Sequence, residues 1–187
     1  FTDWHKGLVN WSEGLDTLNI SLANGTGFID TIQENFVGEK SSILFIPGIM
    51  GSRLYENEDK LWEPFLIGND IQKLYLNRDG KSVNEDIYTK DIIDEVFPVI
   101  GGNIYKSILN DLAEKKDSGD IPDYAVMPYD WRLSFSDILE NGKEESDGRI
   151  YYTRTTSTPY IEKTLRQLAL NSPTGKVTII AHSNGGL

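Results

Sequence analysis

Cysteine is absent from this chain of 187 residues, and histidine occurs only twice, at His5 and His182. The lack of cysteine excludes a disulfide scaffold, a thiolate nucleophile and a thiolate metal site, although it leaves the cellular compartment open. With only two histidines the chain also has no histidine-rich cluster of metal ligands. We therefore expect neither a metal nor a cofactor.

Basic side chains and long apolar runs are scarce as well. The chain has 18 Lys and Arg residues against 29 Asp and Glu residues, which gives a formal net charge of -11. A nucleic-acid partner is not expected, because binding one needs a basic surface that displaces phosphate counterions. The longest apolar runs, 43–46 and 177–181, fall far short of the ~20 residues that span a bilayer, so no transmembrane segment is expected either.

The sequence nevertheless has enough apolar residues for a core. Hydrophobic residues make up 39% of the chain and aromatic residues 11%, which is typical of a globular domain rather than of a disordered chain. Residues 1–40 are polar and rich in turn-forming residues. The alternation of Leu18, Ile20 and Leu22 with polar residues, followed by a turn and the segment 28–32, predicts an antiparallel hairpin. The alternative for residues 1–40 is the end of a preceding module.

The remaining residues, 41–187, alternate between short apolar runs and amphipathic segments. The predicted elements are strand 42–46, a surface insertion over 55–100 without clear periodicity, helix 103–116 capped by Asn103, strand 124–127, a solvated loop at 140–149, a helix that begins at Thr158-Pro159 with Thr158 as its cap, and strand 177–181. This alternation predicts an α/β fold, in which a mostly parallel sheet is covered by helices on both faces.

Three unusual loops follow the three predicted strands. They are residues 47–52, 128–132 and 182–186. In open α/β sheets, functional sites form at the carboxyl ends of the strands, and parallel strands have those ends at the same edge. We therefore expect the three loops to converge on one edge of the sheet.

The last of these loops carries the most specific chemistry. Residues 181–185 (Ala-His-Ser-Asn-Gly) form a small-x-Ser-x-Gly pentapeptide directly after an apolar strand, which is the context of a nucleophile elbow. Such a turn is too sharp for large side chains two residues before or after the serine, and Ala181 and Gly185 occupy those positions. The pattern predicts that Ser183 is a nucleophile whose hydroxyl stands above the sheet edge.

A serine nucleophile also needs donors for the negative charge that develops on the substrate oxygen. The backbone N–H of Asn184, the residue after the nucleophile, is one expected donor. The second is expected from the loop after the first strand, where glycines allow close approach of the backbone, and we assign it to Ile49, with Met50 as second choice. Each donor of this kind is typically worth about 3 kcal/mol of the reaction barrier.

Three segments, in this order and spacing, resemble one family. Residues 43–52 (Ile-Leu-Phe-Ile-Pro-Gly-Ile-Met-Gly-Ser), 128–132 (Pro-Tyr-Asp-Trp-Arg) and 181–186 (Ala-His-Ser-Asn-Gly-Gly) are similar to the lecithin–cholesterol acyltransferase family of α/β-hydrolases. The resemblance covers roughly residues 42–187, and the Tyr-Asp-Trp-Arg run is its most specific part. Residues 1–40 fall outside it.

This resemblance implies an α/β-hydrolase fold, truncated after the elbow, in which 55–100 is a cap-like insertion that helps to hold lipid chains. It implies a lipid ester hydrolase or O-acyltransferase that works through an acyl-enzyme on Ser183, with the 47–51 loop and Asn184 as the oxyanion hole. The implied partners are a lipid or another acyl ester and a peripheral contact with a lipid surface. An extracytoplasmic location is favoured, although the sequence does not fix it.

The catalytic base and acid are missing from this pattern. In α/β-hydrolases they follow the serine in chain order, and only four residues follow Ser183. His182 is its direct neighbour and is expected to point elsewhere as a packing residue, and His5 lies outside the matching region. We therefore expect the chain to be part of a longer protein, inactive by itself, in which 177–181 is an exposed apolar edge.

Two other functions stay open at this point. Residues 183–186 could form an anion cradle at a helix start, as in nucleotide-binding domains, but neither Gly-x-Gly-x-x-Gly nor a Walker-type Lys-Ser/Thr is present. The chain could also be a non-catalytic interaction module. For the neighbouring loop we expect Asp130 to pair with Arg132 rather than serve as a triad acid, and Trp62, Tyr129 and Trp131 to act in packing.

Overall fold

A computed structural model describes residues 9–10, 19–20, 40–63, 71–96 and 102–187. Within its first part, β1 (Val9–Asn10) pairs antiparallel with β2 (Asn19–Ile20). The predicted return strand at 28–32 lies outside the described residues, so the predicted hairpin stays untested.

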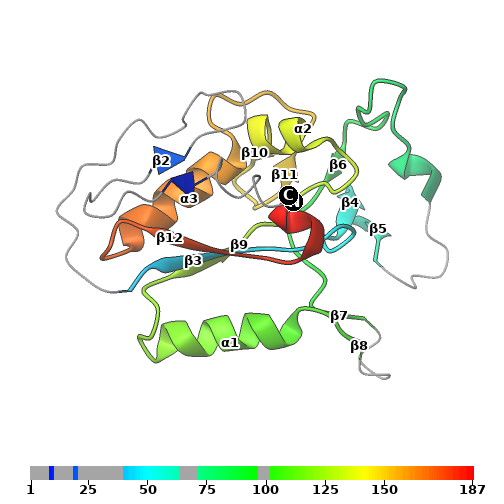
Figure 1. The fold of residues 1–187 in the computed structure, drawn as a ribbon. Coiled ribbons are helices and arrows are strands. Elements are labelled where there is room, and N and C mark those ends of the chain that lie inside the picture. Colours follow the sequence, from blue (N-terminus) through cyan, green and yellow to red (C-terminus); the bar gives the residue numbers. More distant parts are fainter. Residues whose placement is uncertain (1–8, 11–18, 21–39, 64–70, 97–101) are drawn as a thin grey trace.

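A small parallel sheet forms the centre of the molecule. Its strands are β3 (Ser42–Ile46), β9 (Tyr124–Val126) and β12 (Val177–Ala181), in the order β12-β3-β9 (Figure 1). Both pairings are parallel, as predicted, and β9 ends one residue earlier than the apolar run suggested. The described chain is therefore mixed α/β, with β3 between its two partners.

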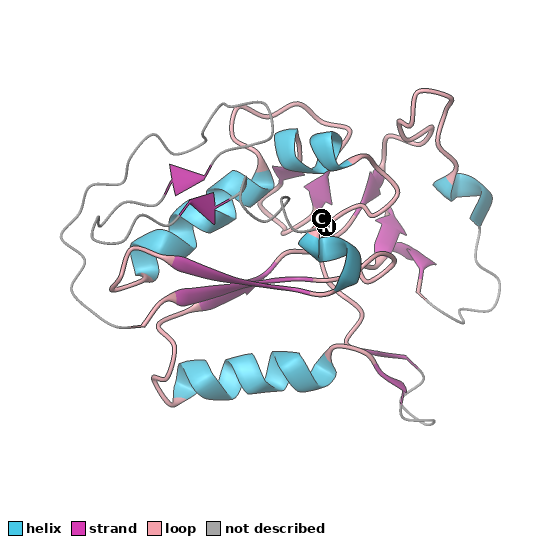
Figure 2. Cartoon of the chain, in the orientation of Figure 1, coloured by secondary structure: helices cyan, strands magenta, loops and turns pink. Residues whose placement is uncertain are grey.

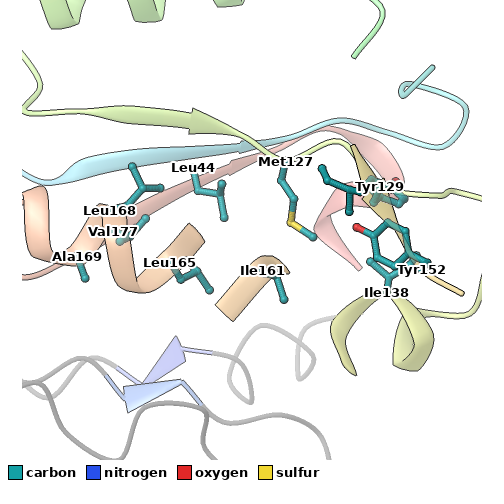
Figure 3. Packing of buried hydrophobic residues seen from close by; sticks show 11 residues of the cluster. Leu44, Met127, Tyr129, Ile138, Tyr152, Ile161, Leu165, Leu168, Ala169 and Val177 are labelled. Atoms are coloured by element: carbon teal, nitrogen blue, oxygen red, sulfur yellow. The ribbon is translucent and has the colours of Figure 1, made fainter. Parts of the chain in front are cut away.

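Helices cover both faces of this sheet, as Figure 1 shows with α1 (Lys106–Asp117) below and α3 (Tyr160–Asn171) above. Successive residues of a strand point to opposite faces. Accordingly, Leu44 joins the cluster formed with α3, whereas Phe45 joins the cluster on the α1 side. Figure 3 shows the first cluster between the sheet and α3; its labelled members are Leu44, Met127, Tyr129, Ile138, Tyr152, Ile161, Leu165, Leu168, Ala169 and Val177.

Both long helices begin later than predicted, and tertiary contacts explain one of the shifts. The N–H groups of Ile104, Tyr105 and Lys106 all donate to the carbonyl of Asp94, at 2.9, 3.0 and 3.0 Å. A backbone carbonyl from a neighbouring segment therefore satisfies the free N–H groups where α1 starts. The predicted cap, Asn103, lies before the helix, but its side chain still binds the first turn: Oδ1 accepts from the N–H of Ser107 at 3.4 Å, and Nδ2 donates to the Ser107 hydroxyl at 2.6 Å.

At α3 the proline itself is the N-cap. Pro159 has an extended backbone with ψ 149°, and the helix starts at Tyr160. Thr158 therefore lies one residue before the cap rather than being the cap. The N–H of Thr158 donates to the Thr156 hydroxyl at 3.3 Å.

The insertion after β3 has its own substructure. In it, β4 (Leu54–Glu56) lies between β5 (Asp59–Trp62) and β6 (Ile87–Tyr88) in an antiparallel sheet, and a 3₁₀ helix, η2 (Ile71–Leu74), packs beside it (Figure 2). We call these elements the β4–β6 lobe. Its buried core consists of Leu54, Leu61, Leu74 and Ile87.

Short hairpins complete the described chain. One pairs β7 (Glu95–Val96) with β8 (Gly102–Asn103), and the other pairs β10 (Lys143–Glu144) with β11 (Ile150–Tyr151). Most of the loop predicted at 140–149 is present as the approach and the turn of the second hairpin, and only residues 143–144 within it form a strand. The helix α2 (Phe135–Glu140) precedes this hairpin. Ser134 is its N-cap, and the Ser134 hydroxyl accepts from the N–H of Asp137.

The parallel sheet provides a matched pair of stability tests. Leu44 and Ile179 lie opposite each other in the β3–β12 register, but Leu44 is fully buried and Ile179 is 41% exposed. We expect Leu44→Ala to lower the free energy of unfolding by about 3 kcal/mol, because it leaves a cavity, and Ile179→Ala to lower it by less than about 1 kcal/mol. Denaturant unfolding measures both, and equal losses would contradict the described sheet order.

Candidate functional site

The three loops at the carboxyl ends of β3, β9 and β12 do converge, as predicted. The N–H of Tyr129 donates to the Ser52 hydroxyl at 3.0 Å, and the Trp131 indole donates to the Ser52 carbonyl at 3.1 Å. From the third loop, the N–H of His182 donates to the carbonyl of Ile46 at 3.0 Å and so extends the β3–β12 ladder by one bond. One edge of the sheet thus carries all three segments.

Ser183 lies at a sharp, strained corner between β12 and η3 (Ser183–Gly186), a single 3₁₀ turn. Its φ is 51°, in the left-handed region. For a residue with a side chain that conformation costs roughly 1–2 kcal/mol. Ser183 is exposed at the sheet edge. This strand–turn–helix geometry agrees with the predicted elbow.

Two glycines allow the corner to sit on the backbone of the first loop. A Cβ added to Gly185 would lie 2.4 Å from the Pro47 carbonyl oxygen and 2.8 Å from that of Ile46. A Cβ added to Gly48 would lie 3.1 Å from Cβ of Ser183. The elbow and the 47–51 loop are therefore in close contact, and no larger residue fits at Gly185.

The two predicted oxyanion donors lie on these touching segments. Residues 48–51 form a turn in which the N–H of Gly51 donates to the Gly48 carbonyl at 3.0 Å. Ile49 and Met50 are its two central residues, and Met50 has φ 60°. The side chain of Ile49 is 55% exposed. The first hydrogen bond of η3 runs from the N–H of Gly185 to the His182 carbonyl at 2.9 Å. Asn184 comes one residue before that donor, so its own N–H has no acceptor within the turn.

Tyr105, which the sequence analysis did not select, connects two of the loops. Its hydroxyl accepts from the N–H of Gly48 at 2.9 Å and hydrogen bonds with Nδ1 of His182 at 2.8 Å. The two rings also pack edge-on, with centroids 5.7 Å apart. His182 thus packs against Tyr105, as its predicted role implied, although the residue is exposed overall.

Tyr129 is also more than the packing residue that was predicted. Its hydroxyl donates to the Pro47 carbonyl at 3.2 Å. Burial raises the pKa of Tyr129 above its usual value. The hydroxyl therefore keeps its proton at neutral pH and remains a donor.

The Asp130–Arg132 pair is buried and structural, as predicted. Nε and Nη2 of Arg132 donate to the two carboxylate oxygens of Asp130 at 2.9 and 2.6 Å, and the side chains are 4% and 6% exposed. Nη1 of Arg132 also donates to the Leu74 carbonyl at 3.1 Å, which ties this loop to the β4–β6 lobe. Next to it, Trp62 and Trp131 pack edge-on at 5.1 Å, which confirms their predicted packing role.

A second ion-pair network holds the end of the first loop. Arg53 donates to Glu63 at 2.8 Å and to Asp94 at 2.7 Å, and its side chain is only 11% exposed. Burial favours the neutral form of Glu63, but hydrogen bonds from Lys60 and Arg53 outweigh it and lower the pKa of that carboxyl. The carboxylate is thus ionised at neutral pH and fixes the backbone directly after Ser52.

Neither a metal centre nor a catalytic base is assigned at this site. Within the described ranges, no group of three or more His, Cys, Asp or Glu residues could hold a metal ion. Of the two histidines, His182 is bonded to Tyr105 through Nδ1, and His5 lies outside the described residues. The arrangement supplies a strained serine and backbone donors, but the group that would take the serine proton is not among them.

Comparisons with known proteins add no further assignment. No protein-family model, curated protein or solved structure matches the chain. The structure shows a mixed α/β fold with a small parallel sheet. In the part of the chain that is described, no helix is long and apolar enough to cross a membrane.

The contact beneath the elbow yields a paired test on neighbouring glycines. In Gly185→Ala the new methyl group meets backbone oxygens, which cannot easily move, so we expect a loss of about 2 kcal/mol in the free energy of unfolding or a displaced elbow. In Gly186→Ala the nearest atom is the Ala181 methyl at 3.8 Å, an ordinary contact, and we expect a change within about 0.5 kcal/mol. Thermal and denaturant unfolding measure both variants. If Gly185→Ala is tolerated as well as Gly186→Ala, the described corner is wrong.

Proposed function

We propose that this chain carries the nucleophile of a serine ester hydrolase or O-acyltransferase that resembles the lecithin–cholesterol acyltransferase family. The observation that supports the proposal most is the position of Ser183, held at φ 51° above a strand end and against the backbone of Gly48. Strained residues of this kind persist where the surrounding structure determines them, and they cluster at functional sites. The substrate class we propose is a lipid or another acyl ester.

In the proposed reaction, Oγ of Ser183 attacks the acyl carbonyl carbon and its proton passes to a general base. The carbonyl oxygen gains negative charge, which the N–H groups of Ile49 and Asn184 stabilise. The tetrahedral species then expels the alcohol, which takes up the proton, and leaves an acyl-serine ester. Water or a second alcohol releases the acyl group and restores the serine. No described residue is assigned as the base.

The structure offers little support for the anion-cradle alternative. The Pro47 and Ile46 carbonyl oxygens lie directly beneath Gly185, and such oxygens repel an anion. Among the described residues, no specific contact favours an interaction module.

A fluorophosphonate probe tests the nucleophile in the protein. We expect covalent labelling at Ser183, because the probe phosphonylates serines that are activated and bordered by oxyanion donors, with loss of fluoride. Labelling and the hydrolysis of p-nitrophenyl butyrate are expected to disappear in Ser183→Ala. Ser157→Ala, an exposed serine in another segment, is expected to keep both.

Peptide mapping of the labelled protein locates the modified residue. Labelling at a different serine, or label and hydrolysis that persist in Ser183→Ala, would overturn the proposal. Equal loss in Ser183→Ala and Ser157→Ala would do the same, since it would reflect general damage rather than loss of the nucleophile.

A further inference from the structure

We infer that Tyr105 and Tyr129 form a clamp that holds the Pro47–Gly48 peptide group from both sides and thereby sets the spacing between Ser183 and its oxyanion donors. In this role both tyrosines are positioning residues. The inference rests on the proposed function of Ser183, but the contacts of the clamp can be tested separately.

Both hydroxyls bind one and the same peptide group. The Pro47 carbonyl accepts from the Tyr129 hydroxyl at 3.2 Å, and the Gly48 N–H donates to the Tyr105 hydroxyl at 2.9 Å. The bond is trans, since the described chain has no cis peptide, so its C=O and N–H point in opposite directions. Hydrogen bonds on opposite sides restrict the rotation of the Pro47–Gly48 peptide plane. A single hydrogen bond would allow it to rotate more freely.

One of the two hydroxyls also holds a direct neighbour of the nucleophile. Tyr105 hydrogen bonds with Nδ1 of His182 at 2.8 Å. The clamped peptide group and the residue before Ser183 are thus connected through one side chain. The contacts span 57 residues for Gly48–Tyr105 and 82 for Pro47–Tyr129, so local sequence cannot make them.

The two tyrosines are themselves anchored in different parts of the core. Tyr105 belongs to the buried cluster on the α1 face of the sheet, where its ring packs edge-on against Phe45 at 5.3 Å. Tyr129 belongs to the cluster on the α3 face, where its N–H is held by the Ser52 hydroxyl. Both side chains are buried, with 7% and 3% exposed. Neither hydroxyl can swing away without disturbing its cluster.

The clamp matters because Ile49, the first proposed oxyanion donor, follows the clamped peptide directly. Rotation of that peptide would move the Ile49 N–H relative to Ser183, whose Cβ already lies close to Gly48. Misplacement of catalytic groups by about 1 Å can cost about 100-fold in rate without weakening substrate binding. The clamp should therefore act on kcat rather than on KM.

The experiment compares Tyr105→Phe, Tyr129→Phe and the double variant in the protein, with p-nitrophenyl butyrate as the ester. Tyr88→Phe is the matched control, because its buried hydroxyl donates to the Asn57 carbonyl in the β4–β6 lobe and touches neither the first loop nor the elbow. We expect each clamp variant to lower kcat by about 100-fold at unchanged KM. The double variant should lose little more, since release of either side frees the same peptide. Tyr88→Phe should keep the kcat of the parent protein.

Hydrogen exchange of the Gly48 amide provides the separate readout. The Leu44 amide in β3 serves as the reference, because it reports general opening of the sheet. The exchange rate of the Gly48 amide relative to that reference should rise in Tyr105→Phe and Tyr129→Phe and stay unchanged in Tyr88→Phe. The clamp is refuted if the Gly48 exchange rate and kcat of the clamp variants are the same as those of Tyr88→Phe. If Ser183→Ala leaves the hydrolysis intact, the proposed function fails, whereas the exchange measurement still decides whether the clamp exists.

Discussion

The close passage of the elbow over the end of β3 is the constraint on which the rest of the site depends. Ala181 pairs with Ile46 in register, the N–H of His182 continues the ladder to the Ile46 carbonyl, and the chain then turns over the Pro47 carbonyl. Only a residue without a side chain fits above that oxygen, so Gly185 is fixed there. The same turn places Ser183 at a positive φ. A loop with more room would leave the serine relaxed.

Such a strained corner persists only where the surrounding structure supports it. Here the support comes from the two core clusters, which hold β3 from both faces, and from a few buried polar contacts to the loops. Ser52 receives two bonds from the loop after β9. Arg53 forms an ion pair with Glu63 next to β5, and Arg132, paired with Asp130, donates to the Leu74 carbonyl of the β4–β6 lobe. These charges are mostly buried, so loss of one partner would leave an uncompensated charge and be costly. The β4–β6 lobe therefore stabilises the loops of the site as well as lying next to them.

The sequence predicts the parts of this arrangement that depend on local pattern. The apolar runs at 42–46 and 177–181 locate two strands, and the common direction of parallel strands brings their loops together. The small residues around Ser183 similarly indicate a sharp turn. The parts that the sequence does not predict depend on distant partners: the Asp94 carbonyl that starts α1, and the hydroxyl of Tyr105, which the helical pattern alone would class as an apolar contact. The β4–β6 lobe escaped detection because its strands of two to four residues are too short to show a period.

The conformation of Ser183 can be tested directly by comparing the unfolding free energies of two variants, Ser183→Gly and Ser183→Ala. Both remove the hydroxyl, so the difference between them reports the backbone alone. At φ 51° glycine is relaxed and alanine is strained, and the glycine variant should be the more stable by about 1 kcal/mol. At an ordinary helical or extended position the order reverses, because glycine loses more backbone entropy on folding. An alanine variant as stable as the glycine variant, or more stable, would show that the serine sits on a relaxed loop and would contradict the account.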